Sequence, residues 1–145
     1  MAVGTDSGAV RNSLGDTFMH RDRLRGVDIV LVDDEIESRK MLTAVLSAAG
    51  ANVLSLASAG AALAAIDQNR PHIVITDIAM PEMDGYTFTR TLRARDYGAQ
   101  LKVAALSAFP ARHDETSGFD AYLSKPIDPF HLVDEVARIA LRAAG

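Results

Sequence analysis

Short apolar runs alternate with helical patterns along most of this chain. Runs of strand length occupy residues 28–32, 53–57, 73–76, 101–106 and 121–123. They are apolar with few interruptions, which predicts strands of a parallel sheet that is covered on both faces. The alternation of strands with helices is typical of an α/β fold.

Four segments between or after these runs repeat apolar residues with a helical period. They cover residues 35–50, 58–70, 86–95 and 128–144. The first has apolar residues at Ile36, Met41, Leu42, Val45, Leu46 and Ala49, and the last at Phe130, Val133, Val136, Ala137 and Ala140. Gly50 is a typical residue to end the first helix.

Residues 1–26 show no lasting strand or helix period. They mix Gly, Ser, Asp and Arg with single apolar residues, and the charge run RDRLRG at 21–26 is typical of a solvated linker. We expect residues 1–26 to be a tail, a linker or a short helix, and residues 27–145 to form one domain.

Composition and charge exclude several classes of protein. The 48% hydrophobic and 23% charged content is that of a soluble globular domain. A net charge of -4, with Lys and Arg scattered, argues against direct nucleic-acid binding. The chain has no Cys, which excludes a thiol nucleophile and fits a reducing cytosol. No apolar stretch approaches the ~20 residues of a membrane span, and the first residues lack the apolar run of a signal peptide. We therefore expect a cytoplasmic location without membrane insertion.

Polar side chains stand where four of the predicted strands end. These residues are Asp33, Asp34, Asp77, Ser107 and Lys125. Each alone has a structural explanation, as a helix cap, a turn residue or a solvated strand end. The carboxyl ends of parallel strands meet at one edge of a sheet, however, so together they predict one polar site. No Gly-rich phosphate loop follows the first strand, which argues against a nucleotide-binding module.

The predicted site joins three carboxylates with a hydroxyl and an ammonium. Clustered carboxylates repel one another unless a cation lies among them. Mg²⁺ prefers oxygen ligands and retains several waters, so it fits this set better than zinc or a full calcium cage. Lys125 and Ser107 could then bind phosphoryl oxygens. The pattern indicates a carboxylate that accepts a phosphoryl group.

Four stretches in this order resemble the receiver domain of two-component response regulators. They are VDDE at 32–35, DIAMPEMDG at 77–85, ALSAF at 105–109 and FDAYLSKPID at 119–128. The resemblance covers about residues 27–142 and implies a flavodoxin-like, doubly wound, five-stranded parallel sheet of order 2-1-3-4-5. The tail, with LRG before the first strand, also resembles the linker that enters the receiver of a hybrid histidine kinase.

The resemblance implies a role for each acidic residue. Asp77 matches the phosphoacceptor. Asp34 matches the direct ligand of Mg²⁺, with Asp33 acting through water and the backbone carbonyl of Ala79 supplying a further oxygen. Mn²⁺ can take the place of Mg²⁺ in this family.

The remaining matched residues concern the phosphoryl group and the response to it. Lys125 matches the phosphate-pairing lysine, with a cis bond to Pro126, while Ser107 matches the switch hydroxyl and Tyr122 the aromatic that turns inward. The implied partner is a histidine kinase or a histidine phosphotransfer protein. The implied domain is a monomer or weak dimer that catalyses only its own Mg²⁺-dependent phosphorylation and dephosphorylation, and is therefore not a metabolic enzyme.

The chain departs from the family pattern in two places. Ser107 and Lys125 are 18 positions apart, roughly four fewer than the pattern expects, or about one helical turn. The fourth helix of the fold is therefore predicted to be shortened or missing, which affects the usual output and dimerisation surface. Ala79 and Phe109 are apolar where polar side chains in relatives help place the attacking water, and this predicts slow self-hydrolysis.

Two other functions deserve comparison. A phosphatase of the haloacid-dehalogenase type also uses a strand-end Asp and Mg²⁺, but it needs a second acid two residues later, where this chain has Ala79. A receiver-like interaction module that is not phosphorylated usually lacks an acid or the lysine, and this chain has both. The altered fourth helix keeps the interaction module open as an alternative.

Overall fold

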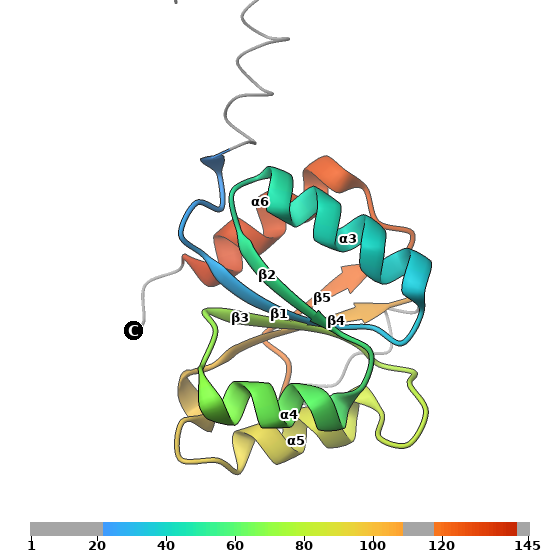
Figure 1. Ribbon diagram of the computed structural model, residues 1–145, viewed down its shortest axis with the longest axis vertical. Helices are drawn as coiled ribbons and strands as arrows, with labels where there is room; N and C mark the ends of the chain where they lie inside the picture. Colours follow the sequence, from blue (N-terminus) through green and yellow to red (C-terminus); the bar gives the residue numbers. More distant parts are fainter. Residues whose placement is uncertain (1–21, 109–117, 142–145) are drawn as a thin grey trace, which may run out of the picture.

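The computed structural model describes residues 22–108 and 118–141, which form a five-stranded parallel sheet between two layers of helices (Figure 1). The strands are β1 (Asp28–Val32), β2 (Asn52–Leu56), β3 (Ile73–Asp77), β4 (Lys102–Ser107) and β5 (Ala121–Ser124). Their order is β2-β1-β3-β4-β5, and each adjacent pair is parallel. The predicted fold class and strand order are confirmed, and every strand boundary lies within one residue of its prediction.

Helices cover both faces of the sheet. They are α3 (Ile36–Ala48), α4 (Ala59–Gln68), α5 (Gly85–Arg93) and α6 (Pro129–Ala140), with a short 3-10 turn η3 (Gly98–Gln100). Figure 1 shows α3 and α6 on one face and α4 and α5 on the other. The segment predicted to hold a shortened or missing fourth helix lies outside the described residues, as does Phe109. Within residues 22–108 and 118–141, no helix has both the length and the apolar content needed to cross a membrane.

Two apolar layers hold the helices to the sheet. Ile29 and Leu31 of β1 belong to the layer under α3 and α6, while Val30 and Val32 belong to the layer under α4 and α5. Successive side chains of a strand point to opposite faces, so a strand with helices on both sides must be apolar throughout. This explains why the strands appear in the sequence as continuous apolar runs.

Leu24 is part of the folded unit, although the sequence analysis assigned it to the tail. Its side chain is fully buried in the layer under α3 and α6. Its backbone N–H donates to the carbonyl of Ala49 at 2.8 Å. One apolar residue within a charge run has no period, so the pattern could not show this packing.

Some residues of the predicted apolar stripes face solvent. Ile36, Met41 and Phe130 are 51%, 40% and 62% exposed. In α6 the buried positions include Leu132 and Ile139, which the predicted stripe omitted. The prediction was wrong there because a helix that packs over a sheet buries a broad face, and the stripe alone does not fix its centre.

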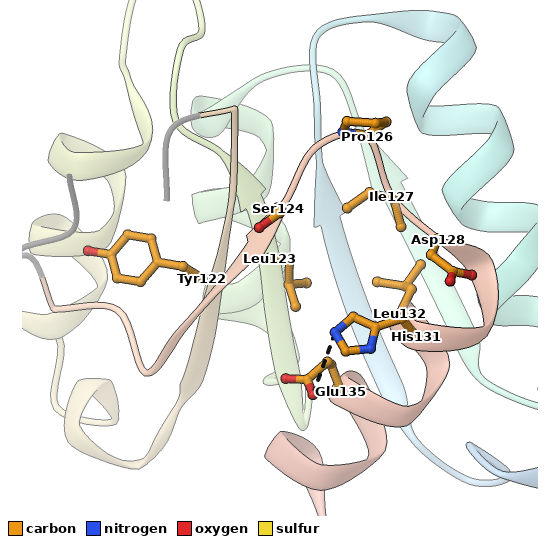
Figure 2. Close-up of a pocket in the computed structure, with 9 residues that line it drawn as sticks. All are labelled: Tyr122, Leu123, Ser124, Pro126, Ile127, Asp128, His131, Leu132 and Glu135. Atoms are coloured by element: carbon orange, nitrogen blue, oxygen red, sulfur yellow. Dashed lines mark ion pairs between the residues drawn. The ribbon is translucent and has the colours of Figure 1, made fainter. Parts of the chain in front are cut away.

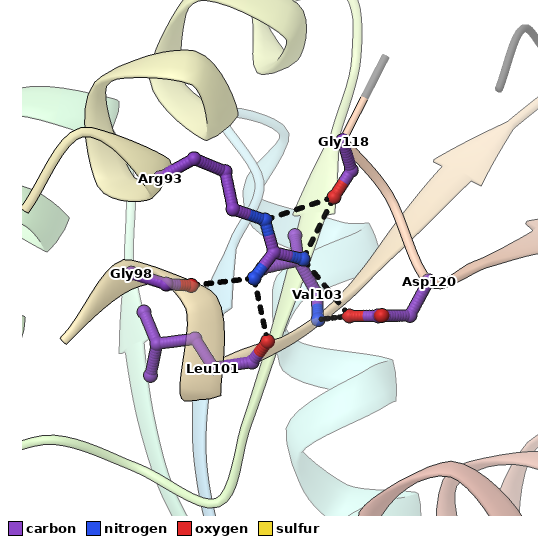
Figure 3. Close-up of polar contacts among 6 residues, drawn as sticks. All are labelled: Arg93, Gly98, Leu101, Val103, Gly118 and Asp120. Atoms are coloured by element: carbon purple, nitrogen blue, oxygen red, sulfur yellow. Dashed lines mark hydrogen bonds and ion pairs between the residues drawn. The ribbon is translucent and has the colours of Figure 1, made fainter. Parts of the chain in front are cut away.

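Arg93, at the end of α5, ties three chain segments together (Figure 3). Its guanidinium donates to the carbonyls of Gly98, Leu101 and Gly118, at distances from 2.6 to 3.1 Å. It also donates to a carboxylate oxygen of Asp120 at 3.0 Å. These contacts use all five N–H donors of the side chain. We call these five residues the Arg93 cluster; it fixes the chain just before β5.

Candidate functional site

Asp77 is the last residue of β3 and lies at the carboxyl edge of the sheet. One carboxylate oxygen accepts the Ile78 N–H at 2.8 Å, and the other accepts the Lys125 ammonium at 3.0 Å. Asp77 does not cap the following helix, because Asp84 does so by accepting the Thr87 N–H. The carboxylate is therefore held in place by hydrogen bonds and lies half-buried at this edge of the sheet.

Gly85 lets the start of α5 come close to Asp77. A Cβ atom at this position would lie 2.5 Å from the Asp77 carbonyl oxygen and 2.9 Å from the Cα of Ile78. The Gly85 N–H donates to the carbonyl of Ile78 at 2.7 Å. Any larger residue would push α5 away from the turn that carries Asp77, so glycine is required here by close approach.

Asp33 is buried at the end of β1, directly beside Asp77. Its N–H donates to the Leu56 carbonyl at 3.1 Å, and its Oδ1 accepts the Glu35 N–H at 3.0 Å. Its Oδ2 is buried and accepts no hydrogen bond from the described residues, although the Lys125 ammonium lies 4.0 Å away. A buried carboxylate oxygen without a hydrogen bond is costly, and such a group needs a further partner.

Asp34 completes a cluster of three carboxylates. Asp33, Asp34 and Asp77 each offer one oxygen, and these oxygens lie within 4.8 Å of one another. Asp34 is exposed, so the cluster opens to solvent on its side. Three oxygen donors, one of them buried with no hydrogen bond from residues that the structure describes, fit a hard divalent cation such as Mg²⁺ that keeps some of its waters. The structure therefore brings together the predicted acids in a set that suits this metal.

Lys125 carries the positive charge of the site. It follows β5, its side chain is 27% exposed, and its N–H extends the ladder to the Ser107 carbonyl at 2.9 Å. The peptide bond between Lys125 and Pro126 is cis, the form that the family resemblance implies. One ammonium against three carboxylates leaves the site with excess negative charge, which again suits a cation.

The electrostatics of Asp77 differ from those of an ordinary surface carboxyl. Burial is the main cause that raises its pKa above the usual value, and the neighbouring Asp33 raises it further. Hydrogen bonds and charge from Lys125, together with the Ile78 N–H, act in the opposite direction without cancelling the rise. A carboxyl whose charged form is disfavoured by burial and by a like charge is a feature of functional sites.

Two further predicted residues lie along the same edge. Ser107 ends β4, where the preceding Leu106 is opposite Asp77 in the β3–β4 register. Ala79 is exposed in the loop that follows Asp77.

Tyr122 lies on β5, opposite Ala105 of β4 in the register of the two strands. Its ring meets the Phe119 ring edge-on, with centroids 5.3 Å apart, and Phe119 in turn lies 5.6 Å from Tyr86 of α5. A pocket of about 140 Å³ between β5 and α6 is lined by Tyr122, Pro126 and His131 among others, but by none of the three acids. Figure 2 shows the Tyr122 ring pointing away from His131.

Arg39 is a residue at this edge that the sequence analysis did not select. Its Nη1 donates to the Asp33 carbonyl oxygen at 2.7 Å. Long side chains on a helix point back toward its N-terminus. A basic residue in the first turn after a strand-end acid could therefore have been recognised as one that reaches back to that acid.

Comparison with known proteins gives a consistent family. Residues 29–137 match the family described as "Response regulator receiver domain". The chain is 36% identical over 121 residues to the response regulator Rre1 of Synechocystis sp., covering 80% of this chain and 52% of that protein. It thus spans about half the length of that relative. It is also 35% identical over 122 residues to an uncharacterised 14.6 kDa protein of Leptolyngbya boryana, covering 81% of this chain and 93% of that one.

A solved structure resembles the fold closely. The receiver domain of the sensor histidine kinase PA1611 from Pseudomonas aeruginosa, which has a magnesium ion coordinated in its active site cleft, matches with a TM-score of 0.74. The two are 28% identical, and the match covers 79% of this chain and 98% of that domain.

Proposed function

The chain belongs to the response regulator receiver domain family of two-component systems, and on this premise we propose that Asp77 accepts a phosphoryl group from a phosphohistidine of a partner protein. One observation carries the proposal. The Asp77 carboxylate lies between the Lys125 ammonium, at 3.0 Å, and two further acids whose oxygens are within 4.8 Å. A nucleophile, a cation for the phosphoryl oxygens and a metal-binding set are thus in one place.

The proposed step is a substitution at phosphorus. An oxygen of the Asp77 carboxylate attacks, the new O–P bond forms, and the P–N bond to the partner's imidazole breaks. The imidazole nitrogen keeps the electron pair and takes a proton from solvent. Lys125 leaves its hydrogen bond with Asp77 for a phosphoryl oxygen, where its charge offsets the negative charge of the transition state. The partner is a histidine kinase or a histidine phosphotransfer protein.

Asp33 and Asp34 would hold a Mg²⁺ ion together with Asp77 and the Ala79 carbonyl. When bound, Mg²⁺ supplies positive charge to the phosphoryl oxygens and relieves repulsion among the acids. Asp33 Oδ2 is buried and accepts no hydrogen bond from the described residues, which supports this assignment because a bound cation would give it a partner.

Signalling follows from the changed charge at Asp77. The Ser107 hydroxyl bonds a phosphoryl oxygen, Tyr122 turns inward, and a pre-existing equilibrium between two conformations shifts. The domain acts on itself and turns over no metabolite, so its output is a conformation that a partner recognises. The alternative, a receiver-like interaction module, would bind its partner without phosphate on Asp77.

The test is formation of an acyl phosphate. We expect the protein to gain one phosphoryl group, seen as a mass increase, when it is incubated with acetyl phosphate and Mg²⁺. The product should be labile to hydroxylamine and absent when EDTA removes the metal. Asp77→Asn should abolish labelling, while Asp96→Asn, which removes the same charge from an exposed loop position, should label as the wild type does.

Two results would contradict this function. Labelling of Asp77→Asn would place the phosphoryl group on another residue. A folded wild-type protein that gains no label with Mg²⁺ from acetyl phosphate or from a phosphorylated histidine phosphotransfer protein would favour the interaction module.

A further inference from the structure

Arg39 lies next to the acidic site, yet the proposed phosphoryl transfer gives it no role. It belongs to the first turn of α3, is half-buried, and its Nη1 donates to the Asp33 carbonyl oxygen at 2.7 Å. This is a short, charge-assisted hydrogen bond, of a class roughly twice as strong as a neutral one. A cation placed beside a cation-binding site needs a reason, because the two positive charges repel each other.

The contact restrains the residue that carries the buried metal ligand. Asp33 is held by its N–H on Leu56, by its Oδ1 on the Glu35 N–H, and by its carbonyl on Arg39. These three contacts leave Oδ2 as the one carboxylate oxygen that faces the cluster with no hydrogen bond from the described residues. The orientation of that oxygen therefore depends on the turn between β1 and α3 keeping its present shape.

The turn lacks a restraint that is present at the starts of α4, α5 and α6. Ser58, Asp84 and Asp128 cap α4, α5 and α6 through their side chains, whereas Glu35 at the start of α3 makes no such bond. An N-cap side chain normally stabilises the start of a helix by accepting a free backbone N–H. Arg39 anchors the turn from the helix side instead, by reaching back over the uncapped end.

We propose that Arg39 is a positioning residue of the metal site, which raises affinity for a divalent cation by fixing the turn that carries Asp33 and Asp34. The inference rests on the proposed function only in taking these acids as metal ligands. The positioning role and charge repulsion predict opposite changes in Mg²⁺ affinity when Arg39 is removed. Charge repulsion alone says that removing Arg39 strengthens Mg²⁺ binding, whereas loss of positioning says that removal weakens it.

The experiment is a calorimetric titration of Mg²⁺ into the full chain, without a phosphodonor. We expect Arg39→Gln to weaken binding by about 10-fold, the lower end of the effect of removing a residue that orients a metal ligand. Arg39→Lys, which keeps the charge and one reaching donor, should recover part of the loss. The matched control is Lys40→Gln, which removes the same charge from the next, exposed position of α3 and should stay within about twofold of the wild type.

The outcomes separate this inference from the proposed function. Unchanged or tighter binding by Arg39→Gln, with a wild type that binds, overturns the positioning role and leaves the phosphoacceptor intact. An equal loss in Lys40→Gln also overturns it, since the effect would then not depend on the contact between Arg39 and the Asp33 carbonyl. No Mg²⁺ binding by the folded wild type overturns the metal site itself. Should Arg39→Gln fail to fold, the comparison of Arg39→Lys with the wild type decides, because full affinity in that variant contradicts a need for the guanidinium.

Discussion

The Arg93 cluster and the acidic site both place charged side chains beside the same sheet, but they differ in how far their polar groups find hydrogen-bond partners. Around Arg93 every guanidinium donor has an acceptor, and Asp120 also accepts the Val103 N–H at 2.7 Å. At the acidic site like charges are neighbours, and Asp33 Oδ2 is buried without a hydrogen bond from the described residues. A polar network whose groups are all hydrogen-bonded makes a fold rigid, whereas a buried polar group without a partner indicates a site that can bind a ligand.

The same contrast appears between two single carboxylates. Hydrogen bonds from Tyr97 and Arg95 lower the pKa of Asp67, which lies at the exposed end of α4. Burial, with the help of Asp33, raises the pKa of Asp77. The pKa values of identical side chains thus shift in opposite directions, because Asp67 accepts hydrogen bonds from several donors and Asp77 is partly buried beside a like charge.

The largest expected effect comes from removing Arg93, whose hydrogen bonds are all satisfied. Arg93→Met removes all five hydrogen bonds and leaves three carbonyls and Asp120 short of a partner, so we expect a loss of about 3 kcal/mol in the free energy of unfolding. Urea denaturation measures it. Arg90→Met is the control, because Arg90 is exposed on the same helix and its guanidinium bonds the Thr87 hydroxyl. Equal losses in both variants would show that the cluster has no special role.

A smaller effect, of opposite sign, is expected at the acidic site. Asp77→Asn keeps the shape of the side chain and removes a charge that burial and Asp33 disfavour, so the metal-free protein should gain about 1 kcal/mol of stability. The measurement is urea denaturation in EDTA at neutral pH. A loss of stability, with Asp96→Asn unchanged, would mean that the Lys125 bond outweighs the repulsion and that the site is not strained.

The smallest effect concerns pH and compares the two carboxylates directly. Since the folded-state pKa of Asp77 is raised, the stability that its protonated form contributes is present below the unfolded pKa of about 3.9 and is lost as pH rises through the folded value. Asp67, with a lowered pKa, contributes stability above the unfolded pKa that is lost as pH falls through its folded value.

The measurement is urea denaturation of the wild type, Asp77→Asn and Asp67→Asn in EDTA across this pH range. The difference in the free energy of unfolding between the wild type and each variant gives the contribution of that carboxyl. The wild type should lose stability relative to Asp77→Asn as pH rises, and gain it relative to Asp67→Asn. Two differences of the same sign would contradict the contrast.

Much of this molecule could be predicted because its main features are local or follow from topology. Continuous apolar runs predicted each strand to within a residue, and the rule that parallel strands end at one edge placed Asp33, Asp77 and Lys125 at one site. The acids were identified by their place in the fold, with no need to know their contacts.

What could not be predicted depends on contacts between backbone groups. Arg93 binds carbonyls of Gly98, Leu101 and Gly118, and a carbonyl belongs to every residue, so it leaves no mark in the sequence. Leu24 was missed because burial of one side chain in a charge run has no period. The exposure of Phe130 was missed because helical spacing gives a stripe without its exact centre.

The strand order has a consequence for how the molecule matures. Asp33 and Asp77 lie at the ends of β1 and β3, inside the sheet. The Lys125 ammonium that pairs with Asp77 follows β5, which is an edge strand and the last strand in the sequence order. Pairings between strands that are far apart in the sequence are intrinsically slow to form. A chain whose β5 has not yet docked therefore has the acids without their counter-charge. The proposed phosphorylation of Asp77 would therefore depend on β5 being docked, because Lys125 reaches the site only with that strand.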